Sequence, residues 1–217
     1  MIIRWMSILI AALISVSAWA SEAKAIQWQD LQPDAPQLRK AVNAMSQEQK
    51  SRLMRAVQQR DLKNMVEKGK LKPSEYTPND VKLLKEDFKD LNPLIAEIEA
   101  FEVKRVKEMA TGLNMQQVQL DGYLLPLTLK GKKVTEFLLV PIIGACIHVP
   151  APPPNQMVVV SYPAGYPQGE LFVPVTIVGK LTIKASKANL ALADGASDVD
   201  VGYAMQASDV REYKPKK

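Results

Sequence analysis

The chain has one cysteine and one histidine in 217 residues, Cys146 and His148. A single cysteine excludes an intrachain disulfide, so the fold must be held by its apolar core, which a chain of this length can supply. A metal site made of cysteine and histidine alone is excluded too, because a closed zinc site generally takes four ligands. Aromatic residues make up only 6% of the chain and are not interleaved with basic ones, which argues against a nucleic-acid partner.

Long apolar runs are also scarce. The longest follows Arg4, extends from Trp5 to Val16, and precedes the small-residue triplet Ala18-Trp19-Ala20. These are the three parts of a cleavable signal peptide, and the run is shorter than the roughly 20 residues that a transmembrane helix needs. We expect residues 1–20 to be a signal peptide cut after Ala20, and the mature chain to be periplasmic without a transmembrane segment.

The net charge is mildly positive. The chain carries 28 basic and 23 acidic side chains, which gives a formal net charge of +5. These charges are spread along the sequence, apart from a short basic tail at 214–217. We expect that tail to be a solvated terminus, because short charged ends rarely order.

The region 37–112 is rich in Lys, Glu, Gln, Met and Leu and poor in glycine, a composition typical of helices. Ser46-x-x-Gln49 has the form of a capping box and predicts the start of a first helix, which Gly69 ends. Thr77-Pro78 predicts the start of a second helix that continues through Phe88. Asn92-Pro93 predicts the start of a third, which ends at Gly112.

Three methionines, Met45, Met54 and Met65, lie along this helical region. They could form a face for a partner protein. Methionine at helical spacing usually fills a core, however, and we favour that interpretation because an unpaired apolar face would otherwise be exposed.

After Met115 the sequence changes to short runs of β-branched and apolar residues separated by Gly, Pro and Asn, which predicts strands joined by turns. The Lys130-Gly131-Lys132 triplet predicts a hairpin turn, and Gly179 predicts a bulge or bend. The strands expected are 117–121, 123–129, 134–140, 145–149, 156–161, 171–178, 180–185 and 199–206.

These patterns predict an α+β fold. We expect an N-terminal extended segment at 21–36, a helical region at 37–112, and a small antiparallel β-barrel at 113–213. Several short strands that close on one another fit a five-stranded barrel of the oligonucleotide/oligosaccharide-binding (OB) type. A β-sandwich is the main alternative.

The segment 137–156, which reads FLLVPIIGACIHVPAPPPNQ, holds the chain's cysteine, its histidine and five of its 15 prolines. Cys146 and His148 are two residues apart in the expected strand 145–149, so their side chains would lie on one face, roughly 7 Å apart. Zinc accepts both ligand types. The remaining ligands would be water, a backbone group, a second molecule, or carboxylates such as those of Glu136, Glu170, Asp121, Asp198 and Asp200.

Two other interpretations of this pair stay open. Cys146 could be a small buried apolar residue and His148 a hydrogen-bonded core side chain. A nucleophilic Cys-His dyad is the third interpretation, but a catalytic base normally has its own orienting partner.

Prolines at 150, 152, 153 and 154 predict an extended polyproline conformation directly after His148. That stiff segment fixes where the amides of Asn155 and Gln156 point. We expect Pro152, Pro153, Pro154, Asn155 and Gln156 to form either a rigid connection between strands or a shaped rim beside Cys146 and His148.

The same segment resembles a bacterial family of exported proteins labelled as a domain of unknown function. Phe137–Pro141 reads FLLVP, Gly144–Pro150 reads GACIHVP, and Pro152–Gln156 reads PPPNQ, each as in that family. Ile142-Ile143 departs from it, because relatives often have an aromatic residue there. Further stretches with the family's pattern are 26–33, 121–127 and 175–181.

The resemblance implies an association with envelope ABC-transporter gene sets, some of them zinc-responsive. Our leading hypothesis is therefore a non-enzymatic periplasmic accessory or binding protein in which Cys146 and His148 contribute to a zinc site. The alternative is a protein-interaction module of a transporter complex that binds no metal. A thiol-dependent enzyme ranks third.

Overall fold

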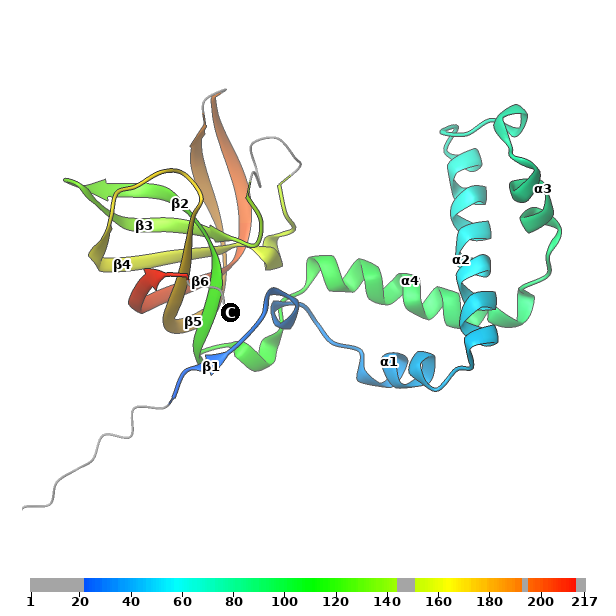
Figure 1. The fold of residues 1–217 in the computed structure, drawn as a ribbon, viewed down its shortest axis with the longest axis horizontal. Helices are drawn as coiled ribbons and strands as arrows, with labels where there is room; N and C mark the ends of the chain where they lie inside the picture. Colours follow the sequence, from blue (N-terminus) through cyan, green and yellow to red (C-terminus); the bar gives the residue numbers. More distant parts are fainter. Residues whose placement is uncertain (1–21, 144–150, 193–194, 214–217) are drawn as a thin grey trace, which may run out of the picture.

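The computed structural model describes residues 22–143, 151–192 and 195–213. The expected signal peptide, the expected strand 145–149 with Cys146 and His148, and the basic tail lie outside the described residues. Figure 1 shows a β-sheet at one end and a bent set of helices at the other. We call residues 36–107 the helical arm, and residues 24–31 together with 108–213 the sheet body.

The three predicted helix starts of the helical arm lie where the sequence placed them, and the third of these helices begins at Asn92. Ser46 accepts a hydrogen bond from the Gln49 amide and completes a capping box, and Thr77 does the same with Asp80. Gly69 adopts a φ of 67°, the left-handed conformation that ends a helix. The elements of the arm are α1 (Pro36–Asn43), α2 (Gln47–Glu67), η2 (Pro73–Glu75), α3 (Pro78–Lys85), η3 (Lys89–Leu91) and α4 (Asn92–Lys107).

Two helices end earlier than predicted. Helix α3, the second of the predicted helices, ends at Lys85 rather than at Phe88, because Phe88 turns into the core of the arm and is only 5% exposed. Helix α4 ends at Lys107 rather than at Gly112, because Glu108 takes an extended conformation with ψ at 157°. Both endings depend on contacts that are distant in sequence.

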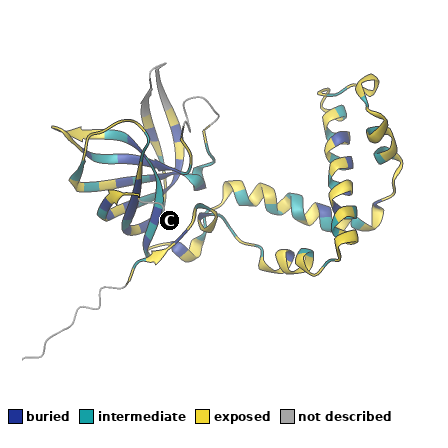
Figure 2. Cartoon of the chain, viewed as in Figure 1, coloured by how far each residue is buried: buried dark blue, intermediate teal, exposed yellow. Residues whose placement is uncertain are grey.

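The arm has a small core of its own, built from Leu53, Ala56, Phe88 and Ile95. Met45 packs against this core, whereas Met54 and Met65 are 63% and 42% exposed. The prediction that the methionines fill a core is therefore wrong for two of the three. Figure 2 shows buried residues concentrated in the sheet body and much exposed surface along the arm.

The sheet body merges the short predicted strands into longer ones. The predicted strands 117–121 and 123–129 form one strand, as do 171–178 and 180–185. The elements are β1 (Lys24–Ala25), η1 (Trp28–Leu31), η4 (Thr111–Leu113), β2 (Gln117–Lys130), β3 (Lys133–Val140), η5 (Pro154–Gln156), β4 (Val158–Pro167), β5 (Val173–Leu192) and β6 (Gly195–Glu212).

The described strands form one sheet in the order β1-β2-β3-β4-β6-β5, and β2 also pairs with β5. That additional pairing closes a ring through β2, β3, β4, β6 and β5. The prediction of an α+β fold is confirmed. The ring is not wholly antiparallel, because the β5–β6 hairpin returns β6 alongside β4 in a parallel pairing.

Glycines set the register at two predicted positions. Gly131 has a φ of 63° and forms the turn of the β2–β3 hairpin. Gly179 lies at a register shift of the β5–β6 pair, where a Cβ atom would stand 2.5 Å from the Gln206 carbonyl oxygen. The predicted hairpin turn and bulge are confirmed.

Both faces of β3 are covered. Phe137 and Leu139 face the interior of the ring, and Leu138 and Val140 face a second apolar cluster that includes Val199 of β6. These four residues of β3 are all fully buried. This two-sided burial explains why the sequence has a continuous apolar run here rather than an alternating one.

Tyr203 of β6 joins the sheet to the two segments that lead into the helical arm. Its hydroxyl donates a hydrogen bond to the Leu31 carbonyl oxygen at 2.7 Å and accepts one from the Ala110 amide at 2.7 Å. The Ala110 amide also contacts the Leu31 carbonyl at 3.2 Å. Burial raises the pKa of Tyr203 to about 12, against a smaller opposing effect of the Ala110 hydrogen bond.

Replacing Tyr203 with phenylalanine tests this junction. Tyr203→Phe should lower the free energy of unfolding by about 1–2 kcal/mol at neutral pH, because it removes two buried hydrogen bonds. The neutral phenol stabilises the fold fully below pH ~10, the pKa of an unfolded tyrosine, and that contribution is lost as the pH rises toward the folded value of about 12.

Urea unfolding between pH 7 and 12 measures this effect, with Tyr213→Phe at an exposed tyrosine as the control. The difference between wild type and Tyr203→Phe should shrink above pH ~10. An equal, small effect of both substitutions at pH 7 would contradict the proposed role of the hydroxyl.

Candidate functional site

A groove of about 1070 Å³ lies where the helical arm meets the sheet body. One wall is the N-terminal segment from Gln29 to Asn43, and the other is the second half of α4 continuing into η4. The two walls come from parts of the chain that are far apart in sequence. The apolar side chains that line it are those of Leu38, Val42, Leu53, Ile98, Phe101, Met109 and Leu113.

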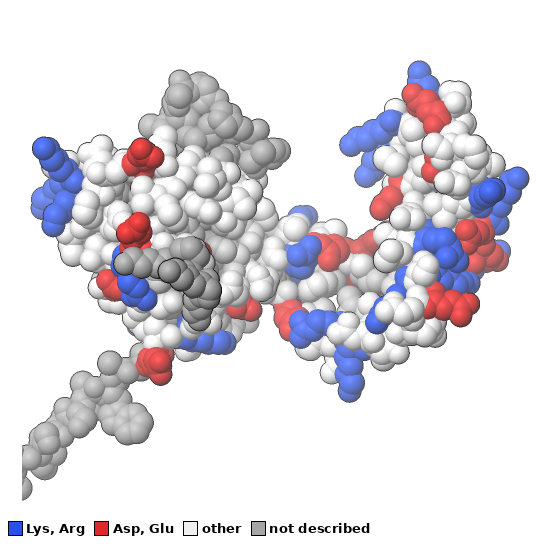
Figure 3. Space-filling view, in the orientation of Figure 1, with Lys and Arg blue, Asp and Glu red and all other residues white. Residues whose placement is uncertain are grey.

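Charged side chains of both signs line the edges of this groove. Arg39 pairs with Asp34 at 2.7 Å on one wall, and Arg105 pairs with Glu102 at 2.5 Å on the other. These pairs are exposed and add little to stability. Figure 3 shows that basic and acidic side chains are mixed along the helical arm, so the groove carries no strong excess of one sign.

The groove was not predicted from the sequence. Ile98, Phe101 and Arg105 follow one another at three- and four-residue spacing along α4, which indicates one helix face. No pattern within a single segment, however, shows that this face stands opposite Leu38 and Val42 of the N-terminal wall. Only the folded chain brings the two walls together.

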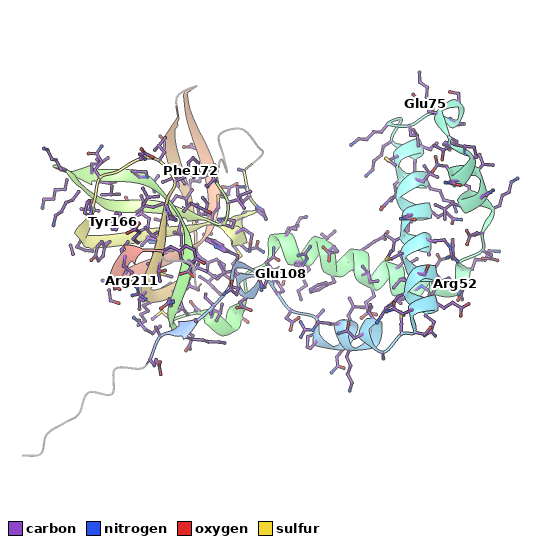
Figure 4. The ribbon with its side chains drawn as sticks, viewed as in Figure 1. Arg52, Glu75, Glu108, Tyr166, Phe172 and Arg211 are labelled. Carbon is purple, nitrogen blue, oxygen red and sulfur yellow. The ribbon has the colours of Figure 1, made fainter. Side chains whose placement is uncertain are left out.

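The predicted rim residues hold the junction in place. Asn155 is fully buried, and its Nδ2 donates to the carbonyl oxygens of Arg105 at 2.7 Å and Glu108 at 2.6 Å. Figure 4 shows Glu108 where α4 reaches the sheet body. Asn155 therefore caps the carboxyl end of α4, and its Oδ1 has no hydrogen-bond partner within the described ranges.

Gln156 acts in the same way on the N-terminal segment. Its Nε2 donates to the Trp28 carbonyl oxygen at 2.9 Å, while the indole of Trp28 donates to the Asp121 carbonyl oxygen at 2.8 Å. Pro153 has the extended polyproline conformation that was predicted, with φ at −61° and ψ at 153°, whereas Pro154 departs from the prediction and begins the 3-10 turn η5. The proline run thus delivers two amides, one to the carboxyl end of α4 and one to Trp28, directly before the N-terminal wall of the groove.

The carboxylates considered as metal ligands are scattered. Asp121 accepts a hydrogen bond from Thr176 and Glu136 accepts one from Thr128. Asp198 is bound by Asn189, and Asp200 pairs with Lys187 at 3.4 Å. No group of three His, Cys, Asp or Glu side chains in the described ranges is arranged to hold a metal ion.

Within residues 22–143, 151–192 and 195–213, no helix combines the length and the apolar character needed to cross a bilayer.

Comparison with known proteins gives one family and one related structure. A family model described as "Protein of unknown function (DUF3299)" matches residues 28–212. The chain is also similar to the crystal structure of a DUF3299 family protein from Pseudomonas aeruginosa PAO1, with 24% sequence identity and a TM-score of 0.48. That alignment covers 90% of this chain and 99% of the other. No curated protein matches.

Substitution of Asn155 tests its role as the cap of α4. Asn155→Ala should lower the free energy of unfolding by about 1–3 kcal/mol, because two carbonyl oxygens lose a buried donor. Asn155→Asp should lower it further at neutral pH, since a carboxylate would face the same two carbonyls.

Hydrogen exchange of the last turn of α4 reports the local effect, with Asn189→Ala as the control because Asn189 is exposed and bonds only Asp198. Exchange in residues 104–110 should accelerate in both Asn155 variants and stay unchanged in the control. Equal protection in all three would exclude the capping role.

Proposed function

We propose that this chain, which belongs to the DUF3299 family of proteins of unknown function, is an exported cell-envelope accessory protein that binds a segment of a partner protein. The groove between the N-terminal segment and α4 carries the proposal. A signal-peptide pattern at residues 1–20 supports the envelope location.

The lining of the groove favours an amphipathic protein segment as its occupant. Half-buried apolar side chains, including Phe101 and Ile98, offer a surface for an apolar face. Paired charges of both signs at the edges, such as Arg39 with Asp34, can exchange partners with charged flanks of the incoming segment. The resemblance to transporter-associated proteins makes a component of an envelope transporter the leading partner class.

The sheet body suits the role of a rigid scaffold. We assign it to the OB type because of the order in which its strands pair. Counted along the chain from β2 to β6, the five strands of the ring pair in the order first, second, third, fifth, fourth and back to the first. The third and fifth strands of the ring, which are β4 and β6, pair in parallel, as they do in the OB topology. OB domains bind diverse ligands, so the assignment alone does not select one.

Site-specific photo-crosslinking in cells tests the groove. A photoreactive amino acid at Phe101, which lines the groove, should give a discrete adduct with one envelope protein. The matched control is Val103, which is 55% exposed, lies two residues along the same helix, and is not among the groove-lining residues. Two residues turn the side chain by roughly 200°, so the control should give no such adduct.

A second variant separates binding from proximity. Leu38→Arg should abolish the Phe101 adduct by placing a charge on the opposite wall, while the unfolding transition confirms that the variant is folded. The same adduct from Phe101 and Val103, or no adduct from either, would exclude the groove as the partner site.

A second candidate function concerns zinc. Cys146 and His148 are two residues apart in the sequence. Zinc accepts both a thiolate and an imidazole as ligands. We propose that these two side chains contribute to a zinc site completed by carboxylate, water or a partner.

Zinc titration of the purified mature chain tests this second candidate. Cys146→Ser and His148→Ala should each weaken zinc binding by on the order of tenfold or more, because each removes a ligand. Asp87→Asn serves as the control, because Asp87 is an exposed carboxylate of the helical arm, pairs with Lys89 and is not among the candidate ligands. Unchanged affinity in both ligand variants would refute the zinc site and leave the groove proposal intact.

A further inference from the structure

The β2–β3 hairpin ends in a basic tip at the end of the sheet body opposite the helical arm (Figure 1). Lys130, Lys132 and Lys133 are all exposed there, and Leu129 beside them is 45% exposed. Figure 3 shows blue side chains gathered at this projecting end. We call residues 129–133 the hairpin tip.

The arrangement of charge in the hairpin tip is unfavourable for the hairpin itself. Lys130 and Lys133 are directly opposite one another across the two strands, and like charges in that position repel. None of the ion pairs found among the described residues involves a lysine of the tip. The nearest carboxylate along β3, Glu136, is bound by the Thr128 hydroxyl at 3.0 Å.

The neighbouring strand holds one of these lysines in place. The stem of Lys133 lies over Gly165 of β4, where a Cβ atom would stand only 2.7 Å from the lysine's own Cβ. Its Nζ donates to the Ala164 carbonyl oxygen at 3.1 Å, and the Gln168 amide donates to the Lys132 carbonyl oxygen at 3.0 Å. The tip is therefore a supported structure rather than a frayed loop.

We infer that the hairpin tip attaches the protein to an anionic membrane surface. The three lysines would contact lipid phosphates, and Leu129 would enter the boundary between headgroups and acyl chains. The exposed leucine favours a bilayer over a soluble acidic polymer, because only the bilayer gives an apolar side chain a place to be buried. This inference is independent of the groove and of the zinc site.

A second group of lysines differs in its surroundings. Lys68, Lys70 and Lys72 are exposed just after the carboxyl end of α2, but Glu67 and Glu75 flank them in the sequence. Figure 4 shows Glu75 at that end of the arm. This group has the same number of lysines without the uniform sign, so it provides a matched comparison.

Vesicle flotation of the purified mature chain tests the inference, with phosphatidylglycerol-containing vesicles compared with pure phosphatidylcholine. Wild type should bind only the anionic vesicles. Changing Lys130, Lys132 and Lys133 together to Gln should weaken binding about 100-fold, at about fivefold for each lysine. The same change at Lys68, Lys70 and Lys72 should have an effect of no more than about twofold, because those lysines lie at the far end of the molecule.

Leu129 gives a second readout. Leu129→Ser should weaken binding at both low and high salt, whereas the effect of the lysine changes should fade as salt is raised. Leu129→Trp should show a blue-shifted fluorescence with anionic vesicles only. Equal losses from the two triple variants, no binding by folded wild type, or binding to an acidic soluble polymer but not to vesicles would each overturn the inference.

Discussion

The buried hydroxyl of Tyr203 makes hydrogen bonds to both segments that leave the sheet body. Leu31 ends the 3-10 turn before the N-terminal wall of the groove, and Ala110 follows the end of α4, which is the other wall. Because these two residues also contact one another, the spacing of the walls is fixed at their base. The geometry of the groove therefore depends on this three-way contact.

The described parts of the motif at residues 137–156 have a structural role. Its apolar run from Phe137 to Val140 is buried on both faces, one in the ring and one beneath the β5–β6 extension. Its closing amides, Asn155 and Gln156, hold α4 and the N-terminal segment. Motif residues before Cys146 and after His148 thus pack the sheet body and bind the segments that lead into the groove.

The two ends of the molecule carry different features. The groove and the helical arm lie at one end, and the basic hairpin tip lies at the other, with the closed ring of strands between them (Figure 1). A protein held at a surface by the tip would present its groove away from that surface. The rigidity of the ring, which buries its largest side chains almost completely, would keep the two ends in a fixed relation.

The sequence by itself determined the features that depend on neighbouring residues: the helix starts at Ser46 and Thr77, the hairpin at Gly131 and the irregularity at Gly179. These follow from hydrogen bonds and backbone conformations within a few residues. The ring closure, the early ends of α3 and α4, and the groove were decided only by the tertiary structure. Each requires groups far apart in sequence, such as Tyr203 with Leu31, to meet in a packed interior, and no local pattern encodes that meeting.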